Sequence, residues 1–557
     1  MPQPYISNNN ILDLSFVING QNNGLHTLFK EGWIQFEINK VAMAKFSFVA
    51  TNLSTDTEEK QAINDLELHA QQASPEIEVT VSINQEKKTI FKGFIKSYNK
   101  QINPHTTEIK IECKDIAFEL TKQSNSFGNA TTFEDVLQFN TQALNIDVIG
   151  LDTVIGKDTM ITPHNNSSVW DYLISYLDTL GYWVCIENGK LKIFDTTQAE
   201  ATKYIAEQGI NVFAYNARTE PQRKKSKVSI ASWDIENQEV NTIEVTQNVN
   251  TNEEILRINN SNFSISTLER MAKAKLTRSN ICSIYGNVLT FGNLEASIGD
   301  YIELQKAEES IDNKAMLITK AIHQFENGNW KTEFNYGQEQ ENSFLETLNG
   351  NRQDTQTRTG LNNSLQGLQI GIVLQIEDDP DNLYRIKVQL PMLAPDTDGV
   401  WARLTHIYAS NDMGSFFIPD VGDEVIIACL DNNPDSPIIL GSLYNPKNSP
   451  PESIDVNNDI KGFVTKEGTK IIFKESEKSI ELSNVSGDKI LISDQKKGIQ
   501  IIDQNGNTIQ MDSNGIALKS NSDIKIETAS SLTIKSSSIK VESSGILELK
   551  GSLIKLN

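Results

Sequence analysis

The sequence predicts a mostly β protein: two β-barrel-like domains with a few helices, a small closed barrel, and a C-terminal stretch in which three copies of the chain intertwine. Three observations support this prediction. Alternating apolar and polar residues, typical of half-buried strands, recur through the first 446 residues. Helical spacing of apolar residues is confined to a few short segments. From residue 471 onward, apolar residues recur as regularly spaced pairs two positions apart.

Length and changes in composition divide the chain into five segments. Its 557 residues are enough for three or four domains. We expect a β domain with helical insertions at 1–200, a second β domain at 201–340, a linker at 341–367, a small barrel at 368–446 and a strand repeat at 447–557. The linker is rich in Gln, Asn, Thr and Glu, which is typical of a connecting segment.

The first two domains have the alternation of antiparallel sheets with one buried face. Strands are expected at 34–38, 44–48, 77–83, 89–95 and 108–113, and then at 301–304 and 330–336. Helical spacing predicts helices at 131–139, 168–177 and 266–277. Asn188 and Gly189 separate two apolar runs, which predicts a hairpin with a two-residue turn.

Residues 368–446 predict the small barrel. Strands are expected at 371–376, 384–390, 400–404 and 424–430, with turns of Pro, Gly and Asp between them. Five short strands in about 80 residues are typical of an OB-like barrel. Pro419, Gly422 and Asp423 are expected to form a structural turn of this barrel.

The last hundred residues contain apolar pairs, each of which predicts a very short strand, because residues i and i+2 share a face in extended chain. The pairs recur every nine or ten residues and then every seven or eight. They are Ile471/Phe473, Ile480/Leu482, Ile490/Ile492, Ile499/Ile501, Ile509/Met511, Ile516/Leu518, Ile524/Ile526, Leu532/Ile534, Ile539/Val541, Leu547/Leu549 and Ile554/Leu556.

Two apolar residues per strand make a thin stripe that no second layer in the same chain covers. A three-sided prism of identical chains would bury every stripe along one axis and leave no long exposed edge. We therefore expect a trimer core at Ile490, Ile492, Ile499, Ile501, Ile516, Leu518, Ile524, Ile526, Leu532, Ile534, Ile539, Val541, Leu547 and Leu549. A disordered Ser-rich tail and a single-chain β-solenoid are the alternatives.

Charge and cysteine content narrow the class of protein. The net charge of −23 argues against binding nucleic acid or an anionic membrane. The N-terminus MPQPYISNNN lacks a basic segment before an apolar core, so we expect no secretion signal and synthesis in the cytoplasm. The four cysteines are far apart and form no CxxC motif, which fits a reducing compartment.

At this point the residues resemble a known family. Gly371-Ile-Val-Leu, Trp401-Ala-Arg-Leu, and the run from Phe417 to Val425 followed by Pro437-Ile-Ile-Leu-Gly-Ser-Leu-Tyr444 resemble the OB-fold domain of VgrG proteins and phage baseplate spikes. Upstream, Phe91-Lys-Gly-Phe, Trp170-Asp-Tyr-Leu, Ile298-Gly-Asp-Tyr-Ile and Trp330-Lys-Thr-Glu-Phe are similar to the hub domains that precede it in that family. The C-terminal pairs are similar to the family's intertwined triple-stranded β-helix.

The resemblance implies a homotrimeric spike at the tip of a contractile injection machine, such as a type VI secretion system, an extracellular tail-like injector or a phage tail. It implies hub domains that meet a hexameric tube protein, baseplate proteins as neighbours, a PAAR-like tip protein as cap, and effectors as possible cargo. The terminal residues Lys555, Leu556 and Asn557 would form the docking surface of the cap. Such a spike is expelled on contraction and pierces a membrane transiently.

No enzymatic or metal chemistry is expected. The six histidines include no HxH or HExxH motif, so no metal site and no cofactor are predicted. The sequence has no Gly-rich phosphate loop and no nucleophile elbow. Residues 445–461 between the barrel and the repeat are far too few for an enzyme domain. The alternatives are a trimeric receptor-binding fibre that recognises a surface glycan and a tailspike that cleaves a surface polysaccharide.

Overall fold

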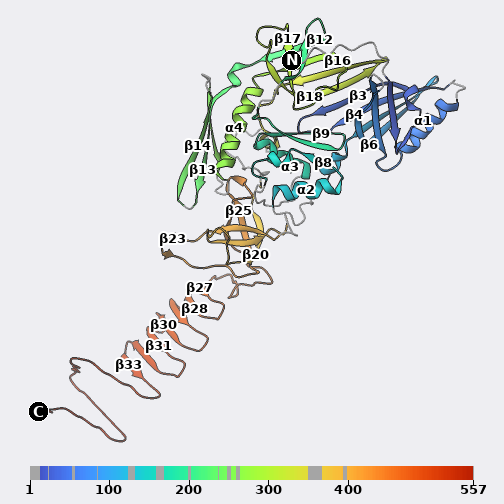
Figure 1. Ribbon diagram of the computed structural model, residues 1–557. Coiled ribbons are helices and arrows are strands. Elements are labelled where there is room, and N and C mark those ends of the chain that lie inside the picture. Colours follow the sequence, from blue (N-terminus) through green and yellow to red (C-terminus); the bar gives the residue numbers. More distant parts are fainter. Residues whose placement is uncertain are drawn as a thin grey trace. The chain divides into compact units, whose positions relative to one another are not determined.

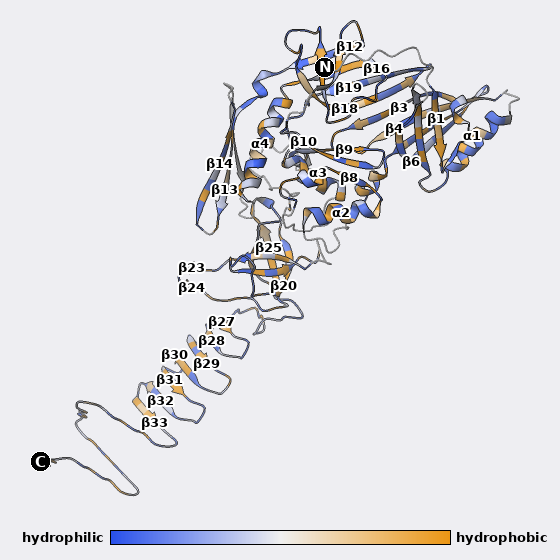
Figure 2. Cartoon of the chain, viewed as in Figure 1, coloured by the Kyte–Doolittle hydropathy of each residue, from blue (hydrophilic) through white to orange (hydrophobic). Residues whose placement is uncertain are grey.

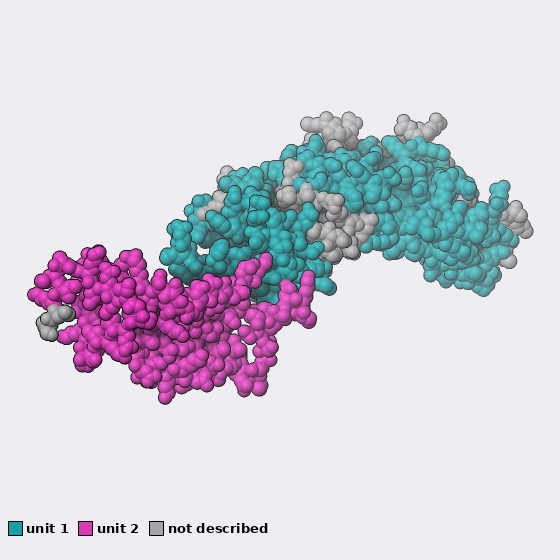
Figure 3. Space-filling model, turned by 90° about the horizontal axis from the view of Figure 1, so that it is seen from below, with its two compact units in different colours: residues 1–443 teal, residues 444–557 magenta. Residues whose placement is uncertain are grey.

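The computed structural model describes residues 13–22, 24–52, 57–83, 86–122, 132–157, 168–198, 202–235, 237–247, 252–258, 264–348, 365, 367–392 and 398–555. Strands hold 44% of the described residues and helices 15%, which confirms the mostly β class. The chain divides into two compact units, residues 1–443 and residues 444–557, which Figure 3 colours separately. The finer domain boundaries expected from the sequence stay predictions.

The first unit is built on a 13-stranded sheet that we call the hub sheet (Figure 1). Its main path runs β12-β16-β19-β18-β3-β4-β7-β6-β5-β1-β2, and β17 joins β11 to β18. The strands are β1 (Asp13–Ile18), β2 (Gln21–Asn22), β3 (Phe29–Glu37), β4 (Met43–Thr51), β5 (Glu76–Ile83), β6 (Glu86–Ile102), β7 (Thr106–Lys114), β11 (Thr202–Glu207), β12 (Val212–Thr219), β16 (Ile284–Phe291), β17 (Tyr301–Gln305), β18 (Ala315–Glu326) and β19 (Asn329–Tyr336).

The two sequence segments that were expected to form separate barrels share this sheet. Strand β18 pairs with β3 in antiparallel register, with Ala321 opposite Phe36 and His323 opposite Ile34. Both strands alternate buried and half-buried residues, so their apolar faces continue one another and make one core. Sequence alternation cannot reveal this pairing, because the two strands are almost 300 residues apart.

Helices pack against both the hub sheet and the smaller sheets of this unit, and their starts follow from local sequence. They are α1 (Thr57–Ala70), α2 (Phe133–Ala143), α3 (Val169–Thr179), α4 (Ile265–Ile281) and α5 (Phe344–Leu348). Thr132 and Asp135 form a capping box at α2, and the Ser168 hydroxyl accepts the N–H of Asp171 at α3. The expected helices at 131–139, 168–177 and 266–277 are thus confirmed, whereas α1 was not predicted.

Two three-stranded sheets complete this region. They are β8-β10-β9, with β8 (Asp147–Ile149), β9 (Tyr182–Glu187) and β10 (Lys190–Asp195), and β14-β13-β15, with β13 (Lys225–Asp234), β14 (Glu239–Thr246) and β15 (Asn252–Ile258). Asn188 and Gly189 have φ angles of 55° and 77° between β9 and β10. This confirms the predicted two-residue hairpin turn, whose primed types require positive φ.

Buried ion pairs connect the first third of the chain to α4. The Asp178 carboxylate binds the Arg278 guanidinium, with side chains only 1% and 6% exposed. Asp178 also accepts the Asn39 amide at 3.2 Å and the Phe344 N–H at 2.6 Å. These three partners come from segments that are distant in sequence, and the pair fixes how the segments dock.

The OB-like barrel is confirmed as a closed barrel of five strands, β20-β21-β22-β26-β25. The strands are β20 (Gln369–Gln375), β21 (Arg385–Gln389), β22 (Val400–Leu404), β25 (Glu424–Cys429) and β26 (Pro437–Ser442), and a small hairpin of β23 (Ala409–Ser410) and β24 (Met413–Gly414) lies between β22 and β25. Val373, Val388, Ala402, Val425 and Ile427 fill the barrel interior. Most of the linker expected at 341–367 lies outside the described residues.

The second unit contains a seven-stranded antiparallel meander. Its strands are β27 (Ile460–Val464), β28 (Lys470–Lys474), β29 (Ser479–Ser483), β30 (Lys489–Ser493), β31 (Gly498–Ile502), β32 (Thr508–Asp512) and β33 (Gly515–Lys519). Strands of five residues alternate with turns of four residues, as at 475–478, and of five, as at 484–488, which explains the interval of nine and ten. The prediction that each pair is a strand is confirmed from Ile471 to Leu518.

Beyond Leu518 the single chain departs from that prediction. None of the described residues 520–555 belongs to a strand, although apolar pairs continue there. The connectors are now only a few residues long, and those at 527–531 and 535–538 contain neither Gly nor Asn. Such connectors do not favour the left-handed backbone that a tight hairpin needs, so this part of the chain lacks a strand partner within itself.

Candidate functional site

Six of the predicted apolar pairs form one continuous face of the meander, which we call the apolar face. Figure 2 shows the apolar stretches along the strands of the meander. Each hairpin from β28 to β33 places apolar residues opposite one another in register. The cross-strand partners are Ile471↔Leu482, Phe473↔Ile480, Ile480↔Ile492, Leu482↔Ile490, Ile490↔Ile501, Ile492↔Ile499, Ile499↔Met511, Ile501↔Ile509, Ile509↔Leu518 and Met511↔Ile516. The sequence spacing thus brings these side chains together on one surface.

Much of the apolar face is exposed in the single chain. The exposed fraction is 46% for Ile492 and reaches 77% for Ile516. Further along, Ile534 and Leu549 are 69% and 68% exposed. A contiguous apolar surface of this length is rare on monomeric proteins and marks an interaction site.

The opposite face of the meander has its own small core, which the sequence analysis missed. Ile472 and Leu491 are buried there, and Glu481 lies between them in register. Lys489 donates a hydrogen bond of 2.7 Å to Glu481. Burial raises the pKa of the Glu481 carboxyl, but the hydrogen bond and charge of Lys489, the Ser483 hydroxyl and the charge of Lys474 together lower it below its usual value. The middle residues of the pairs signal this face only where they are apolar, as at Ile472.

The other predicted site residues fall in different places. Lys555, of the expected cap-docking residues, is exposed, while Leu556 and Asn557 lie outside the described residues. The trimer-core residues from Ile524 to Leu549 are exposed and lie outside the strands.

Pro419, Gly422 and Asp423 form the turn that leads into β25. Gly422 has φ +94°, and its N–H donates to the Val373 carbonyl at 2.9 Å. Val373 donates in return to the Asp423 carbonyl at 3.0 Å, and the Asp423 carboxylate accepts the N–H of Asp420. Pro419 is buried. The turn therefore fastens the start of β25 to β20, which is a structural role in the barrel.

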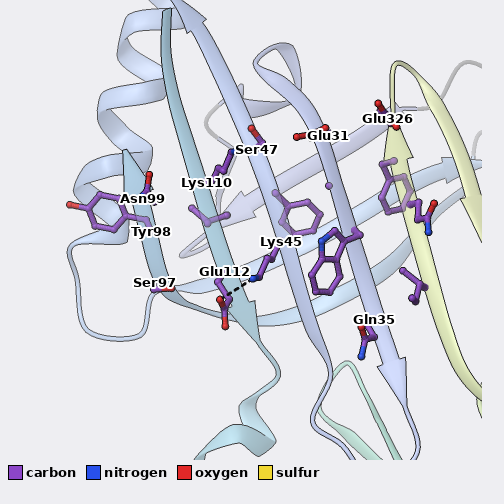
Figure 4. Close-up of a pocket in the computed structure, with 17 residues that line it drawn as sticks. Glu31, Gln35, Lys45, Ser47, Ser97, Tyr98, Asn99, Lys110, Glu112 and Glu326 are labelled. Carbon is purple, nitrogen blue, oxygen red and sulfur yellow. Dashed lines mark ion pairs between the residues drawn. The ribbon is translucent and has the colours of Figure 1, made fainter. Parts of the chain in front are cut away.

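The polar face of the hub sheet carries a hollow of about 660 Å³ (Figure 4). Glu31, Lys45, Lys110 and Glu112 lie along it, so acids and bases are mixed. Lys45 and Lys96 lie 3.4 and 3.7 Å from the Glu112 carboxylate. Burial raises the pKa of Glu112, but Lys45, Lys96 and Lys114 together lower it below its usual value, so this carboxyl is a poor general acid at neutral pH.

The described residues contain no group of three or more His, Cys, Asp or Glu arranged to hold a metal ion. No described helix is long and apolar enough to cross a bilayer.

Comparison with known families identifies two parts of the chain. The type VI secretion system/phage-baseplate injector OB domain family matches residues 369–444, which hold the closed barrel and the turn at Gly422. The Alg8 N-terminal domain family matches residues 8–326, which is more than half of the chain and includes most of the hub sheet.

Curated relatives match a short stretch. The type VI secretion system spike protein VgrG3 of Vibrio cholerae serotype O1 is 36% identical over 78 residues, which are 13% of this chain and 8% of the relative. The spike protein VgrG1a of Pseudomonas aeruginosa is 34% identical over 83 residues, or 14% of this chain and 13% of the relative. The matched stretch is therefore a small part of the length of these relatives.

Solved structures resemble the fold of this chain over most of its length. A chain of the lidded Francisella PdpA-VgrG complex superposes with a TM-score of 0.54 at 11% identity, covering 92% of this chain and 81% of that chain. A chain of the half-lidded Francisella PdpA-VgrG complex superposes with a TM-score of 0.53 at 9% identity, covering 93% of this chain and 89% of that chain.

The hub sheet, the closed barrel and the C-terminal pairs thus follow one another along the chain in the order that the resemblance implied. The chain belongs to the family of the Alg8 N-terminal domain and is a VgrG-like spike protein of the type VI secretion and phage-baseplate kind, with an OB domain.

Proposed function

We propose that three copies of this chain form the spike at the tip of a contractile injection machine, and that their C-terminal repeats intertwine as a triple-stranded β-helix. The observation that carries the proposal is the apolar face, whose side chains line up in register yet stay exposed in one chain. Burial of each such side chain stabilises an assembly by about 1.5–3 kcal/mol. Three faces that meet around one axis would bury them all.

The end of the hairpins at Lys519 supports exchange between chains. The apolar pairs from Ile524 to Leu549 have the alternation of strands, but no strand of the described residues pairs with them. A strand whose backbone groups are unpaired binds another strand readily. In an intertwined trimer the neighbouring copies supply those strands, and tight hairpin turns are no longer needed.

Within the machine, the spike would act mechanically and not as an enzyme. The hub region would meet a hexameric tube protein and baseplate proteins, and the end at Lys555, Leu556 and Asn557 would dock a PAAR-like tip protein. Effectors could travel with the spike, and no nucleic acid would be bound. The chain would be made in the cytoplasm, assembled there and expelled on contraction, when the tip pierces a membrane.

The test is the mass of the purified full chain by light scattering, which we expect to be three times the chain mass. Replacing Ile526 and Ile534 by Asp should abolish the trimer, because the trimer core would bury six unpaired carboxylates. The matched control carries Asp at Lys525 and Thr533, whose side chains point to the other face in extended chain. A monomeric wild-type chain, or trimers that persist undiminished in the first variant, would contradict the proposal.

The alternative roles have their own measurement. A receptor-binding fibre would retain a surface polysaccharide on a binding array, and a depolymerase would shorten it. We expect neither retention nor turnover.

A further inference from the structure

Residues 406–421 form a segment, here called the arm, that leaves the OB barrel between β22 and β25 (Figure 1). Backbone hydrogen bonds hold both ends of the arm to strands of the barrel. At one end Thr405 donates its N–H to the Ile439 carbonyl at 3.0 Å, and at the other Gly422 donates to Val373 at 2.9 Å. Between them only the short β23–β24 hairpin is regular, closed by Ser410 opposite Met413. The arm is therefore a defined projection from the barrel.

Apolar side chains of the arm are exposed. Ile407 is 94% exposed, Phe416 85%, Met413 60% and Tyr408 54%. Long loops with large apolar residues at the surface are uncommon in compact domains and are usually functional. Figure 2 shows the β23–β24 hairpin standing away from the barrel, so the arm does not cover its own barrel.

The same barrel has a second apolar surface, which we call the outer barrel face: Ile370, Leu374, Ile426 and Leu440. Ile370 on β20 lies opposite Ile426 on β25, and Ile370, Leu374 and Leu440 are 38%, 37% and 47% exposed. Strand β20 is apolar on both sides, since Val373 points inward and its neighbours Ile372 and Leu374 point outward. Strands of this composition are usually covered on both faces.

We propose that the arm of one copy packs on the outer barrel face of the next copy, so that three arms close a ring around the OB barrels. This inference rests on the proposed trimer. A ring in which each copy contacts the next in the same way needs two different complementary surfaces on every chain, and this barrel has both.

The partner that we propose for the arm is a second copy of this chain. Strand β26 ends at Ser442 and β27 begins at Ile460, so residues 443–459 connect the barrel to the meander. That connection spans at most about 60 Å even when fully extended. Intertwined repeats would therefore hold three barrels at a high effective concentration of arms and outer barrel faces. The polar tip of the arm, Asn411 and Asp412, would stay in water.

The experiment uses disulfide cross-linking in the full chain. Met413→Cys is combined in turn with Ile370→Cys, Leu374→Cys and Leu440→Cys, and each double variant is oxidised and run without reductant. A disulfide needs Cα atoms within about 7 Å, so three acceptor positions sample the outer barrel face. We expect covalent dimers and trimers from at least one pair, and none from Met413→Cys alone, which controls for the half-buried Cys429.

Two arm variants sharpen the result. Phe416→Ser in the cross-linking background should lower the yield at least tenfold, because the contact loses the most exposed aromatic side chain of the arm. Asn411→Ser, at the polar tip of the same arm, should leave the yield unchanged.

The outcomes separate this inference from the trimer itself. Trimers by light scattering without cross-links at any of the three acceptors would overturn the arm contact and leave the spike standing. Cross-links found only within single chains would overturn it as well. A chain that is monomeric before oxidation would instead remove the proposed function on which the inference rests.

Discussion

The hub sheet and the C-terminal meander are both antiparallel and both alternate apolar with polar residues, yet only the hub completes its core within one chain. Ile34 and Phe48 of the hub are fully buried, whereas Ile492 and Ile516 of the meander remain 46% and 77% exposed. Helix residues join strand residues in the hub core, while among the described residues no second layer covers the apolar face of the meander. A second layer, and not the strand pattern, therefore decides whether a chain folds alone or needs copies of itself.

The substitution with the largest expected effect on stability tests the difference between the C-terminal repeat and the hub. Leu549→Ala should destabilise the trimer by about 2–5 kcal/mol per chain, and hence by roughly three times as much per trimer, because three buried side chains would be lost together. In an isolated chain, where Leu549 is 68% exposed, the same change should cost less than about 0.5 kcal/mol.

Guanidinium-induced dissociation followed by sizing measures this difference. Glu548→Ala, on the opposite side of the same short segment, is the matched control and should leave the midpoint in place. Equal midpoints for both variants would mean that Leu549 is not in a core.

A hub variant should act on the other region alone. Asp178→Ala leaves the Arg278 guanidinium buried without its carboxylate, which should cost the hub about 3–5 kcal/mol. Trp183, whose ring centroid lies 5.4 Å from the Arg278 guanidinium carbon, reports unfolding by fluorescence. Glu341→Ala removes the partly exposed pair with Lys225 and should cost less than about 1 kcal/mol. The trimer mass should be unchanged in both variants.

Acid should weaken the hub through His323. This buried imidazole, hydrogen-bonded to the Thr332 hydroxyl at 3.0 Å, has its pKa lowered by burial from 6.5 to about 4. Because the unfolded chain then binds the proton more readily, the stability due to neutral His323 is complete above pH 6.5. It falls by about 3 kcal/mol as the pH drops to 4.

The measurement is the free energy of hub unfolding at a series of pH values. His323→Gln keeps a partner for Thr332 but cannot titrate, so its curve should be flatter than that of the wild type between pH 6.5 and 4. Parallel stability curves for the two proteins would show that this imidazole does not titrate between pH 6.5 and 4.

The smallest effect concerns the barrel turn. Gly422→Ala should cost about 1 kcal/mol, because φ +94° disfavours a side chain although no atom lies within 4 Å of the added methyl group. Gly441→Ala meets equally open space without a positive φ and should be neutral. Thermal unfolding of the two variants compares them directly, and equal melting temperatures would exclude backbone strain at Gly422.

Local sequence explains why many elements could be predicted. The helix starts at Thr132 and Ser168 and the turn at Asn188 and Gly189 depend on residues within a few positions of one another. Helix α1 escaped prediction, since only Ala62, Ile63 and Leu66 are buried among its charged residues.

Long-range contacts explain what could not be predicted. The pairing of β18 with β3 and the ion pair of Asp178 with Arg278 join segments 100 or more residues apart. For any alternating strand, several other strands of the chain would satisfy the same pattern as pairing partners. For any buried acid, several basic residues of the chain could form its ion pair. The sequence did not predict the arm for a related reason, because composition does not show that Ile407 and Phe416 are exposed.

By itself the sequence determined the mostly β class, the five-stranded barrel and the apolar pairs that share one face, because strand periodicity and turn chemistry act between near neighbours. Only the tertiary structure decided that two halves of the hub share one sheet, and that the apolar face and the arm remain uncovered in one chain. The reason is that burial depends on what packs against a strand, and the packing partner lies far away in the sequence.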